Sequence, residues 1–162
     1  MMVLLFSMRA FWIWLVWAMA MLSALAEKPV TGQVFKCLPL LLDQQGNDAT
    51  CPSLFDRDAY QFYLRQHPVK IHGLRVDVQW KASKAPGEDL IVRVELRGVL
   101  KDGSPSVRDF ETPVTAGHFS HWTSFLLSGK DFDQFGNLAA WHATLWDGNR
   151  LLGEQQSFLW QK

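Results

Sequence analysis

Two stretches of the sequence carry an apolar residue at every second position, and this pattern constrains the fold more than any other feature. Their apolar positions are Leu74, Val76, Val78 and Trp80 in residues 74–81, and Leu90, Val92, Val94 and Leu96 in residues 90–97. A period of two is that of a β-strand with one buried face. We therefore expect two half-buried strands, with a turn at 85–88 between them.

The two strands could pair with each other as a hairpin. If Trp80 lies opposite Leu90, the solvent-facing Asp77 lies opposite Arg93. Opposite charges at facing positions favour that register. We therefore predict a hairpin of residues 74–81 and 90–97.

Five further strand-like segments lie elsewhere in the chain, with turn residues between most of them. They are residues 34–42, 107–115, 119–127, 139–145 and 151–160. Pro39 and Pro113 place the first and second of these at sheet edges, and Gly153 suggests a bulge in the last. The pattern is typical of an antiparallel immunoglobulin-like β-sandwich of about seven strands. A small β-barrel is the alternative.

One early segment, residues 53–66, has helical character. Ser53 with Asp56 three residues later resembles a capping box, and the helix should end at His67, before Pro68. The apolar residues of the segment share one face at helical spacing and are expected to pack on the sandwich. These residues are Phe55, Ala59, Phe62 and Tyr63.

Residues 1–26 read as a secretory signal peptide. Arg9 is their only charged residue, an apolar run follows it, and Ala24 and Ala26 form an A-x-A cleavage site. We predict cleavage after Ala26, which leaves residues 27–162 as a single exported domain in the periplasm or outside the cell. The alternative is an uncleaved membrane anchor, which is the one way in which we expect the chain to contact a membrane.

Charge and cysteine content narrow the function classes. The chain has 16 Lys and Arg against 16 Asp and Glu, so it offers no basic surface for nucleic acid. Its two cysteines, Cys37 and Cys51, are expected to form a disulfide in an oxidising compartment, which would stabilise the fold by about 3 kcal/mol. The alternative is two free thiols.

The sequence contains no nucleotide loop, no nucleophile elbow and no C-x-x-C pair, so we expect neither a catalytic residue nor a cofactor. His118 and His121 are three apart, but on a strand that spacing sends side chains to opposite faces. A metal site would therefore need distant ligands, and none is predicted. An enzyme with a dispersed site at His118, His121 or His142 is kept as an alternative.

Tryptophans provide the other candidate binding residues. Trp80 and Trp141 lie on expected core faces, whereas Trp122, Trp146 and Trp160 could be exposed and stack on sugars or anchor a partner. A competing explanation, which we favour, is that Trp146 packs beneath the helix 53–66.

The segment Pro52–Gln61, with Trp146-Asp147-Gly148 and Ser157-Phe158-Leu159-Trp160 near the end, resembles uncharacterised exported bacterial proteins of the immunoglobulin-like β-sandwich type. The resemblance implies an exported β-domain and assigns no activity to it. Together these features predict a non-catalytic accessory or protein-interaction module of the bacterial cell envelope. Its expected partner is an envelope protein, and a carbohydrate-binding module with a glycan ligand is the alternative.

Overall fold

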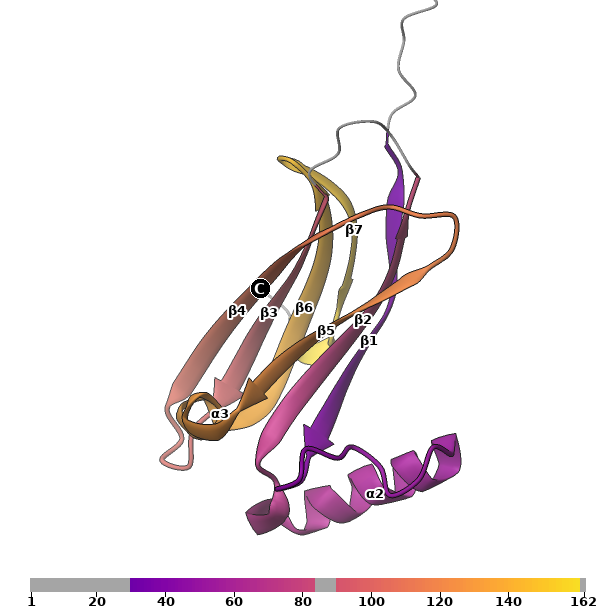
Figure 1. The fold of residues 1–162 in the computed structure, drawn as a ribbon. Coiled ribbons are helices and arrows are strands. Elements are labelled where there is room, and N and C mark those ends of the chain that lie inside the picture. Colours follow the sequence, from indigo (N-terminus) through magenta and orange to yellow (C-terminus); the bar gives the residue numbers. More distant parts are fainter. Residues whose placement is uncertain (1–29, 84–89, 161–162) are drawn as a thin grey trace, which may run out of the picture.

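The computed structural model describes residues 30–83 and 90–160, which fold into two stacked antiparallel sheets (Figure 1). The expected signal peptide and the turn at 85–88 lie outside the described residues. Seven strands make up the sheets: β1 (Gly32–Leu42), β2 (Gly73–Ala82), β3 (Leu90–Val99), β4 (Pro105–Val114), β5 (His121–Ser128), β6 (Asn137–Asp147) and β7 (Arg150–Gln156). The first sheet has the order β1-β2-β5, and the second has the order β4-β3-β6-β7.

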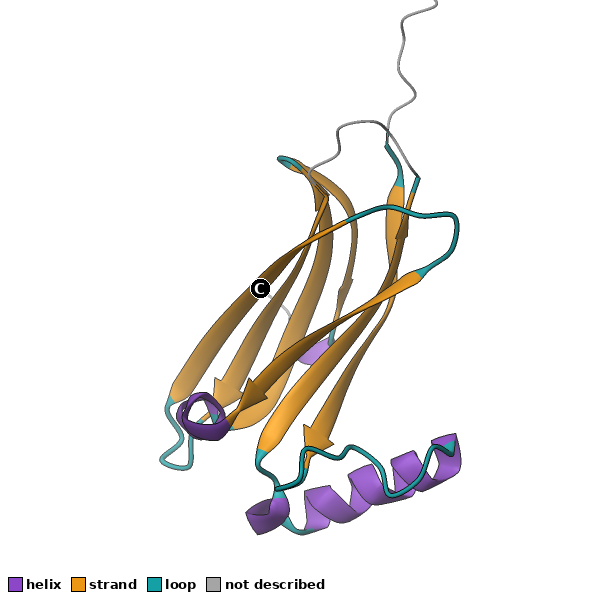
Figure 2. Cartoon of the chain, in the orientation of Figure 1, coloured by secondary structure: helices purple, strands orange, loops and turns teal. Residues whose placement is uncertain are grey.

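In the described segments, short helical elements connect or follow the strands (Figure 2). They are α2 (Leu54–Gln66), η2 (Pro68–Lys70), α3 (Gly129–Phe135) and η3 (Phe158–Trp160). The mainly β architecture confirms the predicted sandwich, and the edge positions of β1 and β4 agree with Pro39 and Pro113. The last strand is shorter than predicted, because the chain leaves β7 after Gln156 and turns into η3.

The core lies between the sheets and uses the alternation seen in the sequence. The inward residues of β2 and β3, from Leu74 to Trp80 and from Leu90 to Leu96, are at most 2% exposed. The indole N–H of the buried Trp80 also has a hydrogen-bond partner, since Nε1 donates to Thr123 Oγ1 at 2.9 Å. The apolar faces of the two strands therefore pack against each other, which explains why each has one buried face.

The predicted hairpin of β2 with β3 is wrong. β2 pairs with β1 and β5, while β3 pairs with β4 and β6 in the other sheet. The expected pairing of Asp77 with Arg93 is replaced by other ion pairs: Arg75 pairs with Asp48 and Asp77, and Arg93 pairs with Glu111 at 2.7 Å. Alternation requires only that each strand buries one face. Two strands that lie in different, stacked sheets meet this requirement as well as two strands that pair in one sheet.

The two sheets close against each other along one side, where β1 meets β7. Gly153 makes this approach possible, because a Cβ there would lie 2.9 Å from Gln33 Cα. The register of β6 with β7 shifts at this point, which confirms the predicted bulge. The β1–β7 side of the sandwich is therefore a closed seam.

Candidate functional site

The helix α2 lies across one end of the sandwich, where β1 ends, rather than on the face of a sheet (Figure 1). Its start is fixed by Ser53, whose Oγ accepts a hydrogen bond from Asp56 N at 3.4 Å. Its end is fixed at His67, whose N–H donates to Leu64 O before Pro68 begins η2. These bounds confirm the predicted helix 53–66.

A buried glutamine anchors this helix to the sheet. Gln61 is 3% exposed, and its Nε2 donates to Leu41 O at 2.8 Å and to Asp48 O at 2.9 Å. Its Oε1 accepts from Leu41 N at 2.8 Å. The amide thus continues the backbone hydrogen bonding of β1, and Leu64, fully buried one turn later, packs beside it.

A second contact joins α2 to the loop after β1. The Tyr60 hydroxyl donates to Asp43 Oδ2 at 2.8 Å, and Asp43 also accepts from the backbone N–H groups of Gln45 and Asn47. Desolvation alone would raise the pKa of Asp43, but the bonds from Asn47, Tyr60 and Gln45 outweigh it and lower that pKa. The same bond to Asp43 raises the pKa of Tyr60.

The opposite face of α2 is apolar and open to solvent, so the predicted packing of this face on the sandwich is wrong. Phe55 is 80% exposed and Phe62 is 62% exposed, and Ala59 lies between them on the same face. We call Phe55, Ala59 and Phe62 the apolar stripe. Hydrophobic spacing identified the face but not its direction, because the polar Gln61 takes the buried position.

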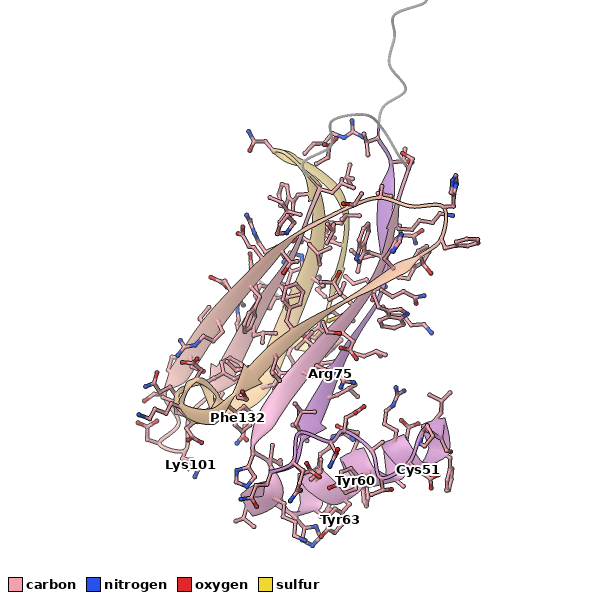
Figure 3. All side chains as sticks on the ribbon, in the orientation of Figure 1. Cys51, Tyr60, Tyr63, Arg75, Lys101 and Phe132 are labelled. Carbon is pink, nitrogen blue, oxygen red and sulfur yellow. The ribbon has the colours of Figure 1, made fainter. Side chains whose placement is uncertain are left out.

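A groove runs between α2, η2 and the loop after β1. It measures about 640 Å³ and is lined by Asp43, Gln44, Gln45, Tyr60, Tyr63, Val69, Lys70 and His72 (Figure 3). Its size would suit a small ligand. However, Tyr63 is already packed by Tyr60 at 5.9 Å and His67 at 4.2 Å between ring centroids, and Lys70 Nζ lies over its ring at 4.9 Å. Of these contacts, the one from Lys70 joins η2 to α2, and the others lie within α2 and its C-cap.

The three candidate tryptophans do not form one site. Trp122 lies on β5 and is 49% exposed, whereas Trp146 and Trp160 belong to the other side of the molecule. Trp146 points outward from β6, but the Arg93 guanidinium covers its ring at 5.5 Å and Nε1 donates to Thr144 Oγ1. The expectation that the helix covers Trp146 is wrong, because α2 packs on β1 and η2 at the end of the opposite sheet.

Trp160 is buried, because η3 folds back over the outer face of the second sheet. Its ring lies 3.8 Å from the Arg97 guanidinium carbon and 5.3 Å from the His142 ring. His142 in turn bonds Glu154 at 2.8 Å. Of the three tryptophans, Trp122 is the exposed one, whereas Trp146 is partly buried and Trp160 is buried.

The histidines are likewise dispersed. His121 stacks on Trp80 in the first sheet at 5.2 Å, His142 lies on the outer face of the second, and His118 is exposed on the loop before β5. Among residues 30–83 and 90–160, no three His, Cys, Asp or Glu side chains gather in a way that could hold a metal ion. The structure therefore assembles no histidine site in these segments.

The predicted disulfide is absent, and both cysteines are free thiols. Cys37 points into the core from the middle of β1, whereas Cys51 is exposed in the loop just before the start of α2 (Figure 3) and donates to Asp56 Oδ2 at 2.7 Å. Burial first, and the Asp77 carboxylate second, raise the pKa of Cys37 to about 12. Cys37 lies between the two sheets and Cys51 lies outside them, beside α2. The spacing of the two cysteines in the sequence could not reveal this separation.

Comparison with protein-family models, with curated proteins and with solved structures finds no match for the chain. The resemblance to exported immunoglobulin-like proteins therefore stays a prediction. None of the helices in the described segments is both long and apolar enough to cross a membrane.

Proposed function

We propose that the protein is an exported, non-catalytic interaction module of the bacterial cell envelope, and that it binds its partner through the apolar stripe of α2. The observation that carries this proposal is the exposure of Phe55 and Phe62 on a helix that is firmly anchored by its other face. Exposing large aromatic side chains costs free energy in water, and covering them on a partner recovers it.

The geometry of the stripe defines the chemistry of the partner. Phe55, Ala59 and Phe62 follow the i, i+4, i+7 spacing by which a helix docks into an apolar groove. Asp58 and Arg65 lie along one flank, and neither makes an ion pair within the described chain. The matching surface is a concave apolar groove on another envelope protein, with a basic and then an acidic group on one rim.

Site-specific photo-crosslinking in cells tests this function. A photoreactive residue at Phe55 or at Phe62 should give the same discrete protein adduct. A photoreactive residue at Val107, which is 56% exposed on β4, is the matched control and should not give it. Adducts of equal yield at all three positions, or none at the stripe, would contradict the proposal.

Carbohydrate binding is a second candidate, carried by Trp122 alone. This ring is half-exposed on a flat sheet face, and Gln79 lies opposite it on β2 with Ser120 within hydrogen-bond reach. An aromatic platform beside an amide suits a sugar ring. Titration with polysaccharides should then change the tryptophan fluorescence of the protein and of Trp146→Ala, but not that of Trp122→Ala. An unchanged spectrum with every glycan would remove this candidate.

A further inference from the structure

The sandwich has four edge strands, and three of them are protected from pairing with another chain. β1 and β7 close against each other at the Gly153 seam. β4 contains Pro105 and Pro113, which cannot donate a ladder hydrogen bond, and it carries Arg108 and Glu111. Prolines, charges and covered edges are the devices by which natural sheets avoid edge-to-edge association.

The fourth edge, β5, has none of these protections. Its sequence from His121 to Ser128 contains no proline and no Asp, Glu, Lys or Arg. It pairs with β2 on one side, and residues 122–127 make no other backbone hydrogen bond within the described chain. The free side of β5 therefore offers an open row of backbone donors and acceptors.

The outward side chains of β5 also leave apolar surface beside that edge. Trp122 is 49% exposed and Leu126 is 58% exposed, with Ser124 between them. In an antiparallel pair, residues that face each other lie on the same side of the sheet. When two copies of β5 pair antiparallel, the register in which Ser124 faces Ser124 of the other copy places each Trp122 opposite a Leu126 on the same side of the sheet.

We propose that β5 is a homodimerisation edge, where two copies of the chain pair antiparallel with Ser124 on the two-fold axis. In this arrangement Trp122 packs against the partner's Leu126, and the reverse contact forms by symmetry. The three-stranded sheets of the two copies join into one continuous sheet. The self-complementary register is the reason for choosing a second copy over an unrelated extended peptide. This inference rests on β5 alone and is independent of the proposed role of α2.

Cysteine crosslinking tests the register directly. In a Cys51→Ser background, Ser124→Cys should form a disulfide-linked dimer on mild oxidation, because facing Cα atoms lie about 4.5–5.5 Å apart. Trp122→Cys alone and Leu126→Cys alone should not form a disulfide-linked dimer. In the proposed register the two copies of each cysteine are offset by four residues along the strand, about 13 Å. A mixture of these two variants should link.

Sedimentation across a concentration series tests the dimer itself. The wild type should dimerise, and Leu126→Lys should weaken the dimer about tenfold, because both symmetric Trp–Leu contacts are lost. Val107→Lys is the matched control, because Val107 is exposed on β4, an edge that is protected from pairing, and this change should leave the dimer intact. A protein that stays monomeric at every concentration overturns the inference. A dimer in which Ser124→Cys fails to crosslink also overturns the inference. If Phe62→Asp dissociates such a dimer, its interface is α2 rather than β5.

Discussion

The Gln61 amide is expected to decide whether α2 stays on the sandwich, and Gln61→Ala tests this. The substitution removes three hydrogen bonds, two to the backbone of Leu41 and one to Asp48 O. At about 1 kcal/mol net for each bond, the attachment of α2 should weaken by about 3 kcal/mol, which is roughly a hundredfold in the equilibrium for local detachment.

Hydrogen exchange followed by mass spectrometry measures this effect locally. Amide protection in α2 should fall by about that factor, while amides in β2 and β3 should keep theirs, because the core between the sheets does not contain Gln61. Gln66→Ala is the matched control, since it makes the same change at an exposed position of the same helix. Equal α2 protection in the two variants would refute the anchoring role, and a uniform loss across the core would refute its local character.

Three further predictions follow from the side-chain contacts. A thiol reagent should label Cys51 alone in the native protein and reach Cys37 only after unfolding; a native chain with no free thiol would contradict this. Because the folded-state pKa of Asp43 lies below its ordinary 3.8, its carboxylate should stabilise the fold above about pH 4, and this stability should vanish as the pH falls through the folded pKa. Measured by urea unfolding, Asp43→Asn should lose less stability than the wild type over that acid range. Identical pH profiles for the variant and the wild type would contradict this prediction. Thr123→Val leaves the buried Trp80 N–H without an acceptor and should cost about 1–3 kcal/mol of unfolding free energy in urea; an unchanged midpoint would show that the bond is dispensable.

The sequence predicted the strands well because alternation is a local signal. Strand existence, the bulge at Gly153 and the edge position of Pro39 all follow from neighbours in the chain. The choice of strand partners does not, since β2 and β3 could satisfy their alternation either side by side or face to face. This choice depends on the whole topology, which is why the hairpin prediction failed.

The candidate site was harder to foresee for a related reason. Spacing located an apolar face on residues 53–66, and the usual rule places such a face in the core. Gln61 reverses the orientation because its amide can bond the unpaired backbone at the end of β1, a group that only the tertiary structure brings near. The cysteine pairing failed similarly, because compartment chemistry says whether a disulfide can form but not whether two side chains meet.

The most direct test of the central claim is whether the apolar stripe is covered in the cell. Ala59→Cys, in a Cys51→Ser background, places a single exposed thiol between Phe55 and Phe62, and Val107→Cys places one on β4. The rate of maleimide labelling is then compared between intact cells and the purified protein. The account predicts strong protection of position 59 in cells and none at position 107. Equal labelling rates for position 59 in both settings would show that nothing occupies the stripe, and would contradict the proposed function.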